Sequence, residues 1–595
     1  MIKKLFNKEK LKFLVPFGAA IALIGGVTAV WWVVRQNTPV EGLPVGSEVL
    51  PQTTATTLTF TTNENQWQQL QQFGNRETKA ALAESFTKLR DRYLTSNGLN
   101  YNRDIKPWVG QEVTVAFLPP VSNNNQPASQ PFNPNGLVDT PPVFILPIAN
   151  PAKAQALMAT PKTADGQAWV ERDYKGQKIR EVHGQEEPAY AATVIDNRIV
   201  VVSPSAPAIE QVIDTFKGKP PLSRISEYSQ AFKQLKTVAP FVRLYVNVPA
   251  TEKMTASNPA QPIPPQALSL LHNNQGMVST VNLVQEGVRL QGLSWVAPDS
   301  KVRYRTDNKA QRMPSLLPSQ TVMMTSGGSF KQFWQETSQK NDKNPAPRAS
   351  GYSLSTIQSG LENLTGMNVE KDFLPWMDGE FALGLITEPA TAPTPAAGIM
   401  LLIQASDRRA AEQALKKLDQ VVKDRYQFQV SQSDAGVVKW VSQFTALSTT
   451  HGWLDGNVLY LAIGPGVSNL VAPAAGKTLA EADLFRRATA TDLPANNGHF
   501  FLNAEPLANN ANLPFPILPT ENRAVLSAIR AIGVTTAVQD GHTFQFDTQV
   551  LLQKLGADDG VPLPASPNVS PNASPEVSPS VSPSISPSVS PLRSP

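Results

Sequence analysis

The chain has 595 residues, 41% of them apolar and 17% charged, which suffices for several folding units and is typical of a globular protein. Its formal net charge of +4 equals the charge of residues 1–12 alone, where five lysines oppose Glu9. The remainder is neutral overall, so we expect no nucleic-acid partner. The absence of cysteine excludes disulfides, thiolate metal sites and cysteine nucleophiles.

The first predicted element is a transmembrane helix over residues 13–34. These 22 residues carry no charge, and at about 1.5 Å each they span a bilayer. The lysine-rich segment 1–12 predicts a cytoplasmic N-terminus and an extracytoplasmic bulk, in a periplasm or a lumen. A cleaved signal peptide is the alternative, but its apolar core is shorter and ends in small residues, whereas this run ends in Trp31-Trp32-Val33-Val34. We therefore expect an uncleaved single-pass anchor that binds the lipid bilayer.

Small residues recur every fourth position within this apolar run, at Gly18, Ala22 and Gly26. Such a face lets two membrane helices approach closely, so it suggests a weak homodimer. Small residues are also common in membrane helices that do not dimerise, and the sequence leaves both interpretations open.

The ectodomain contains an internal duplication. Residues 98–112 (GLNYNRDIKPWVGQE) match residues 366–380 (GMNVEKDFLPWMDGE), and Trp67 recurs as Trp334. The shared pattern predicts a linker at 35–47, a first repeat at 48–298, a linker at 299–314 and a second repeat at 315–556. Sequential strands joined by short Asp-Asn, Asp-Gly and Glu-Gly turns predict antiparallel sheets with helices on one face, an α+β fold.

The alignment of later strands is less distinctive. Residues 143–149 (VFILPIA) are matched to residues 399–405 (IMLLIQA), an offset of 256 residues. Helices are predicted to follow, with Asn150-Pro151 and Ser406-Asp407 as N-cap and first residue. Residues 557–595 repeat Ser-Pro and lack bulky side chains, which predicts a disordered tail.

The lysine-flanked apolar run, the duplicated Pro-Trp turn before a strand, and the Trp67 helix after Leu50-Pro51 resemble one family. The chain is similar to the membrane-anchored cyanobacterial proteins grouped as domain of unknown function 3352. The resemblance covers residues 1 to about 556 and implies a location and an architecture. It implies no catalytic residue.

Motifs for phosphate or metal binding are incomplete. Gly476-Lys477-Thr478 lacks the earlier glycine of a phosphate-binding loop, because Val471 stands there, and Gly464-Pro465-Gly466 lacks the third glycine of a dinucleotide site. No two histidines have metal-ligand spacing; they are His183, His272, His451, His499 and His542. We predict no cofactor and no metal, although a site assembled from distant residues stays open.

Two acidic pairs recur in both copies, Asp104 with Asp372 and Glu112 with Glu380. Paired carboxylates could serve a glycosidase, but their positions beside the Pro-Trp turn favour turn capping and strand-edge roles. Trp108 and Trp376 could bind sugar rings if exposed; recurrence at a helix-to-strand junction favours a core position instead. We therefore assign no catalytic residue.

These observations favour a non-catalytic binding or scaffold protein of the cell envelope, with a protein or glycan partner in a cleft between the two repeats. One alternative is an envelope hydrolase or carbohydrate-active enzyme with a non-local site. Another is an assembly factor for a membrane complex that acts through the anchor.

Overall fold

The computed structural model describes residues 42–554 with internal gaps. The residues left out between those bounds are 96–97, 120–140, 160–168, 183–189, 236–238, 257–273, 298–299, 301–302, 305–308, 340–353, 388–396, 435, 444–447, 465–466, 468–475 and 507–526. The predicted anchor, Gly18, Ala22, Gly26 and the Ser-Pro tail lie outside the described residues. Within the described part, no helix is both long and apolar enough to cross a bilayer.

The first half of the chain forms ten antiparallel strands. Their order across the sheet is β4-β5-β6-β7-β3-β2-β1-β8-β9-β10. The strands are β1 (Thr56–Thr61), β2 (Glu112–Phe117), β3 (Pro142–Pro147), β4 (Trp169–Tyr174), β5 (Gln177–Val182), β6 (Tyr190–Ile195), β7 (Ile199–Ser203), β8 (Val242–Asn247), β9 (Asn274–Val284) and β10 (Gly287–Val296).

The second half repeats this order as β14-β15-β16-β17-β13-β12-β11-β18-β19-β20. The strands are β11 (Thr321–Gly327), β12 (Phe381–Thr387), β13 (Ala397–Gln404), β14 (Gln429–Gln432), β15 (Val438–Val441), β16 (Ser448–Leu454), β17 (Val458–Ile463), β18 (Gly498–Asn503), β19 (Ile529–Val538) and β20 (Thr543–Leu552). The predicted α+β fold with a mainly antiparallel sheet is confirmed. The domain boundaries stay predictions.

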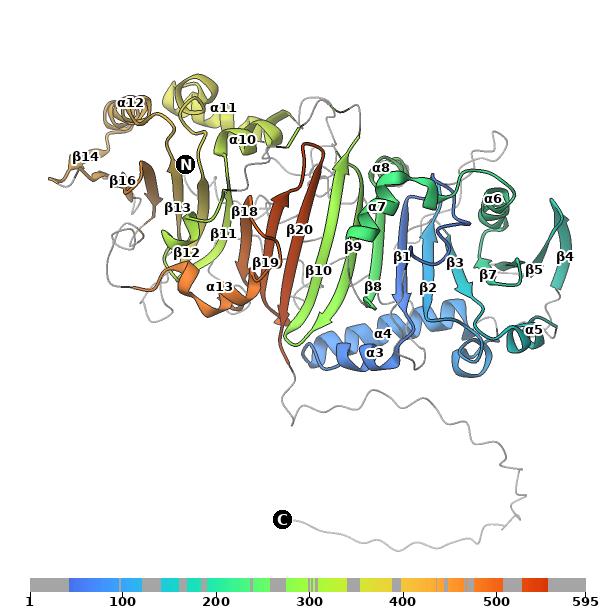
Figure 1. Cartoon of the computed structure of the whole chain (residues 1–595). Helices are drawn as coiled ribbons and strands as arrows, with labels where there is room; N and C mark the ends of the chain where they lie inside the picture. The colour runs from blue at the N-terminus through green and yellow to red at the C-terminus, as the bar shows by residue number, and fades with distance from the viewer. Residues whose placement is uncertain are drawn as a thin grey trace, which may run out of the picture.

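The two halves share one sheet. The last strands of each half, β10 and β20, pair along nine residue pairs from Gly287–Leu551 to Trp295–Thr543, which gives twenty continuous strands (Figure 1). At about 4.8 Å per strand the sheet is roughly 90 Å wide. The expected cleft presupposed two separate units, and that premise is wrong because backbone hydrogen bonds join the units edge to edge.

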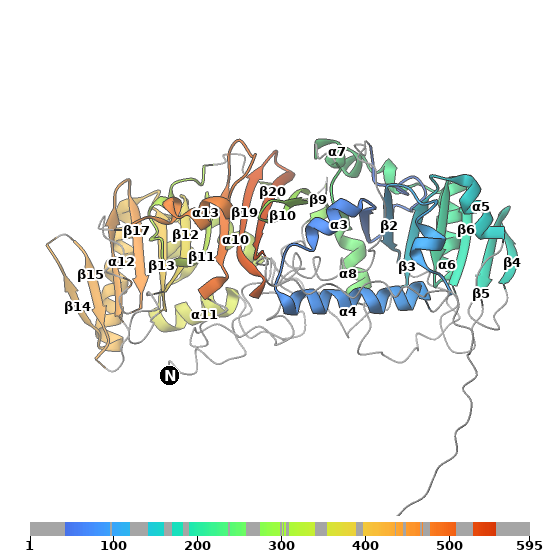
Figure 2. The ribbon, with the colours of Figure 1, turned by 90° about the horizontal axis from the view of Figure 1, so that it is seen from below.

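Helices cover both faces of the sheet, not one face as predicted. In the first half, residues of α6 and α7 share a buried cluster with Ile145, whereas Trp67 of α3 packs on Val115 of the opposite face. Figure 2 shows α7 and α4 on opposite sides of the sheet. We name the two sides the α7 face and the α3 face. The correction has a simple cause: strands such as β2 and β3 bury apolar side chains in both directions, so a single helical layer cannot cover them.

The helices of the first half are α3 (Glu64–Leu70), α4 (Arg76–Tyr93), η3 (Tyr101–Ile105), α5 (Pro151–Ala159), α6 (Ala206–Phe216), η4 (Leu222–Arg224), α7 (Ser226–Gln234) and α8 (Val248–Ala256). Those of the second half are η5 (Met313–Ser315), α10 (Phe330–Gln339), α11 (Leu354–Thr365), η6 (Val369–Phe373), α12 (Arg408–Tyr426), η8 (Leu479–Glu481) and α13 (Asp483–Ala488).

The register corrects one sequence alignment. Val115 pairs with Phe144, and its counterpart Leu383 pairs with Leu401, so β3 and β13 are offset by 257 residues and not by 256. The N-caps agree with this offset, because the side chains of Asn150 and Asp407 accept bonds from Lys153 N and Ala410 N. Asp407 is therefore the N-cap and not the first helical residue. Both strands are apolar on both faces, so residue type alone could not fix their register.

Candidate functional site

The repeated Pro-Trp sequences close a one-turn π-helix in each half. In the first half, Asp104 Oδ2 accepts the Asn100 amide at 2.7 Å, and Trp108 Nε1 donates to the Asp104 carbonyl at 2.7 Å. The second half repeats both bonds, at 2.7 and 2.9 Å, with Asn368, Asp372 and Trp376. Trp108 is 2% exposed and Trp376 is 1% exposed, so both rings fill the core as the recurrence predicted.

The repeated glutamates both help to hold the segment that leads into their half of the sheet, Glu112 through Arg243 and Glu380 directly. Glu112 and Arg243 form a buried ion pair, with Nε and Oε1 separated by 3.1 Å, and Arg243 also donates to the Gly42 carbonyl. Glu380 accepts the backbone amides of Arg312 and Met313 at 2.7 and 3.0 Å. The predicted structural role of this pair therefore matches the contacts in both halves.

Burial dominates the electrostatics of these carboxyls. Desolvation raises the pKa of Glu112 to about 7, against the opposing attraction of Arg243. Desolvation also raises the pKa of Glu380, and the two backbone amides limit that rise. A carboxyl with a raised pKa could act as a general acid, but each of these groups is buried and bonded to the chain itself.

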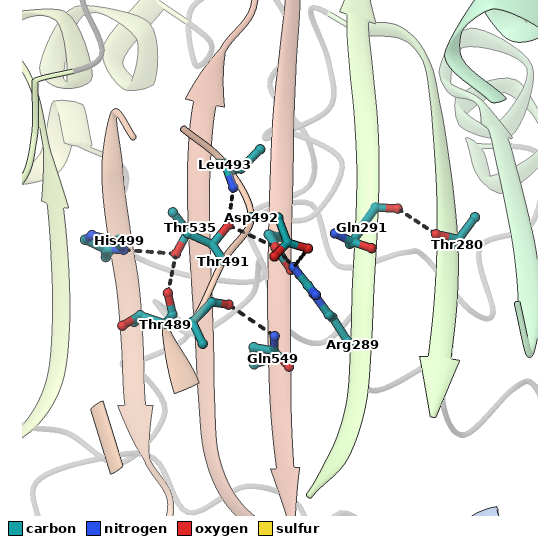
Figure 3. Close-up of polar contacts among 12 residues, drawn as sticks. Thr280, Arg289, Gln291, Thr489, Thr491, Asp492, Leu493, His499, Thr535 and Gln549 are labelled. Atoms are coloured by element: carbon teal, nitrogen blue, oxygen red, sulfur yellow. Dashed lines mark hydrogen bonds and ion pairs between the residues drawn. The ribbon is translucent and has the colours of Figure 1, made fainter. Parts of the chain in front are cut away.

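A polar cluster lies on the α7 face at the seam between β10 and β20, where the halves meet, and we name it the seam cluster (Figure 3). Arg289 of β10 donates to both carboxylate oxygens of Asp547 of β20, at 2.9 and 2.5 Å, and to Asp492 at 2.7 Å. Thr491 donates to Asp547 at 2.9 Å. The bidentate geometry is the strongest form of this ion pair, and the Asp547 side chain is almost fully buried. The cluster therefore ties one half of the chain to the other.

A histidine completes the cluster on the side of the second half. His499 Nδ1 lies 3.0 Å from the Thr535 hydroxyl, which donates to the Thr489 carbonyl (Figure 3). Burial lowers the pKa of His499 to about 4, so the imidazole is neutral at neutral pH. β8 and β18 both end on an asparagine, and counting back four residues from each places His499 at the position of Arg243. One position thus holds a charged clamp in one half and a neutral ring in the other.

The remaining candidates have structural partners. His451 Nε2 and Trp440 Nε1 both bond to Asp419 Oδ1, at 2.8 and 2.7 Å, and His451 is buried. Among the described residues, no three His, Cys, Asp or Glu residues form a group that could hold a metal. Thr478 pairs with Pro318 and caps the short helix η8 through Glu481, so it serves a turn. His183 and His272 lie outside the described residues.

An apolar area on the α3 face of the second half is exposed. It consists of Phe333 of α10, Leu383 of β12 and Ile399 of β13, which are 41%, 39% and 43% exposed. Leu385, two residues after Leu383 on the same face, pairs with Ile399, and the Phe333 ring lies 5.2 Å from that of Phe381. We name these three residues the open apolar surface.

The first half covers the equivalent position. Val115, the counterpart of Leu383, is 5% exposed and shares a cluster with Trp67 and Phe60. In the second half Trp334 packs instead on Val369 and Leu374 of the η6 turn. The indole that covers β2 in one half therefore does not cover β12 in the other.

Sequence reasoning did not find the seam cluster or the open apolar surface. Neither recurs between the halves, so the duplication that highlighted Glu112 and Trp108 gave no signal for them. The alternation of Arg289 and Gln291 with Val288 and Leu290 does mark β10 as a strand with one polar face. The partner of that polar face, Asp547, is 258 residues away.

Comparisons with known proteins give a family and no activity. Crystal forms I, III and IV of TP0453 are 10–13% identical to the chain and cover 44% of it and 82–83% of their own length, with TM-scores of 0.22–0.23. Similarity at this level carries no argument. No curated protein matches the chain. Residues 17–552 match the family described as "Protein of unknown function (DUF3352)". The chain therefore belongs to the DUF3352 family.

Proposed function

We propose that the chain is a non-catalytic scaffold of the cell envelope, anchored by residues 13–34 with its N-terminus in the cytoplasm and its sheet outside. The sequence supports this topology through the 22-residue apolar run and the five lysines before it. The contacts of the recurring residues support a scaffold, because the repeated carboxylates and tryptophans bond to the chain itself.

The open apolar surface is the observation that carries this proposal. Three large apolar side chains at about 40% exposure lie together on a face that the first half buries. A contiguous apolar area that is exposed to water is unfavourable unless a partner covers it. The partner is an envelope protein that inserts an apolar, aromatic-bearing segment, since an indole covers the equivalent position of the first half.

A continuous sheet suits this role. Both halves pair through β10 and β20, and Arg289 and Asp547 reinforce the pairing, so the open apolar surface has a fixed position relative to the first half. A partner bound to the second half is therefore held at a defined distance from the segment that leads toward the anchor.

Photo-crosslinking in intact cells tests the proposal. A photoreactive phenylalanine at position 383 is expected to capture a recurrent envelope protein, identified by mass spectrometry. Val170 is the matched control, because it is 51% exposed on the end strand β4, outside this surface. The substitution Ile399→Lys should abolish capture from position 383. Equal capture from positions 170 and 383, or no recurrent partner from position 383, would overturn the scaffold proposal.

A further inference from the structure

Residues 42–50 lie across the α7 face of the first half and are held there by side chains of two strands. Arg243 of β8 donates to the Gly42 carbonyl at 2.8 Å, and Thr114 of β2 donates to the Val45 carbonyl at 2.7 Å. Val49 and Leu50 are buried in the main cluster of that face. We name residues 42–50 the strap.

Backbone bonds hold the other end of the strap. The amides of Ser223 and Leu222, in η4, donate to the carbonyls of Ser47 and Leu50 at 2.9 and 2.7 Å. Gly46 has a φ of +85°, and a Cβ there would lie 2.7 Å from Ile145 Cγ2, so the strap touches β3 at a position that only glycine fits. The strap therefore contacts β2, β3, β8 and η4 along its whole length.

The Gly42 end depends on a buried charge. Arg243 is 5% exposed and is positioned by Glu112, which is equally buried. A buried guanidinium is tolerated only when it is paired and its donors are satisfied, and here the Gly42 carbonyl satisfies one of them. The counterpart of Arg243 in the second half is the neutral His499. The buried Arg243–Glu112 pair thus occurs only in the first half, where the strap connects the sheet to the N-terminal part of the chain.

We propose that the Arg243–Glu112 pair is a clamp that fixes the strap, and with it the chain leaving the N-terminal apolar run, rigidly to the first half of the sheet. Only residues 35–41 separate that run from Gly42. Seven residues extend at most about 25 Å, so the clamp holds the sheet within that distance of the bilayer and limits its motion. The consequence for the bilayer rests on the anchored topology proposed above; the clamp itself does not.

Hydrogen exchange of the full chain in lipid nanodiscs tests the clamp. Arg243→Met is expected to speed exchange of the amides of residues 42–50 at least tenfold, with no change in peptides of β11 to β18. Thr114→Val keeps the shape of the side chain and removes the hydroxyl that bonds to the Val45 carbonyl and to the Thr59 hydroxyl, so a several-fold increase is expected for residues 42–50. Arg289→Met is the matched control: it breaks a buried ion pair at the seam, outside the strap, and should leave exchange of the strap unchanged.

If Arg243→Met unfolds the first half, the Thr114→Val result decides. Unchanged exchange of residues 42–50 in Thr114→Val and in any folded Arg243 variant would overturn the clamp. The clamp would also be overturned if Arg289→Met sped exchange of residues 42–50 as strongly as the other two variants, since the faster exchange would then reflect general destabilisation.

Rigid attachment to the bilayer has its own readout. The chain has no cysteine, so a single fluorophore can be placed at Lys217→Cys, an exposed position after α6. Its anisotropy should decay with the slow rotation of the whole nanodisc, and Arg243→Met should add a fast component. Free rotation in the unsubstituted chain would refute rigid attachment. Loss of the chain from membranes in alkaline carbonate would refute the anchored topology and leave the exchange result for the clamp standing.

Discussion

Phe546 lies directly opposite Gly292 on the paired strands β20 and β10, and a Cβ at position 292 would come within 2.2 Å of its ring. The two residues belong to the two strands, β10 and β20, through which the halves pair (Figure 1). The turn before β20 is longer than the turn before β10, because Val538 pairs with Phe544 whereas Val284 pairs with Gly287. The Phe546 ring leaves no room for a side chain at position 292, so one half supplies the ring and the other supplies the space.

This relationship predicts an asymmetric response to substitution. Gly292→Ala should lower the free energy of unfolding by about 2 kcal/mol, because the added methyl meets both the Phe546 ring and the Val278 carbonyl oxygen, at 2.6 Å. Phe546→Leu should recover part of this loss in the double variant, since it removes the ring but not the carbonyl. Urea unfolding of the four proteins of this double-mutant cycle gives the coupling. Strict additivity would show that the two positions do not interact.

Removing one partner of the Arg289–Asp547 ion pair should destabilise the chain more than removing both partners. Arg289→Met leaves the buried Asp547 carboxylate without its partner and should lower the free energy of unfolding by about 3–5 kcal/mol. The double variant Arg289→Met with Asp547→Leu should lose less than that single variant, because no buried charge remains. Chemical denaturation measures both. If the double variant is less stable than Arg289→Met alone, the bonds of Asp492 and Thr491 contribute more to stability than the Arg289–Asp547 pair itself.

His499 should make the chain sensitive to acid. Its folded pKa of about 4 lies below the ordinary 6.5, so the folded state favours the neutral ring. The stability that this provides is fully present above pH 6.5 and is lost as the pH falls toward 4, by up to about 3 kcal/mol. His499→Phe should flatten this part of the stability profile, measured by urea unfolding from pH 4 to 7.5. Parallel profiles for the two proteins would contradict the assignment.

Glu112 should act in the opposite direction. Burial raises its folded pKa to about 7, so the folded state favours the protonated carboxyl. The stability that the protonated Glu112 carboxyl provides is fully present below about pH 4.5. It is lost as the pH rises through 7, and the loss is on the order of 3 kcal/mol. Glu112→Gln should remove most of the decline between pH 5 and 8, whereas Glu380→Gln should remove less of it, because two backbone amides limit the rise of the Glu380 pKa. Heat denaturation across this range provides the comparison.

The open apolar surface should tolerate charge. Leu383→Lys and Ile399→Lys remove no buried contact of a fully packed residue, so each should change the free energy of unfolding by less than about 1 kcal/mol. Val115→Lys, at the equivalent position of the first half, buries a charge under Trp67 and should destabilise the chain severely. Thermal unfolding of the three variants distinguishes the positions. Severe loss in Leu383→Lys would mean that this surface is covered within the chain.

The sequence by itself determined the duplication, the antiparallel α+β fold and the buried Pro-Trp turns. Each of these rests on local patterns: short apolar strands, tight turns, and the Asn100–Asp104–Trp108 spacing, whose bonds span only four residues. Because these patterns span only a few residues, they form the same local structure in both halves, and their recurrence therefore predicted that structure. The family match over residues 17–552 likewise rests on the sequence alone.

Tertiary structure alone decided how the halves meet, which faces the helices cover and which apolar residues stay exposed. Arg289 and Asp547 are 258 residues apart, and nothing in either local sequence specifies the other. Apolar strands such as β3 and β13 look alike in either register, so only the pairing of whole strands fixed the offset of 257. The exposure of Leu383 and the burial of Val115 differ because Trp334 and Trp67 pack in different directions. Side-chain direction follows from the packing of the whole, and sequence spacing does not contain it.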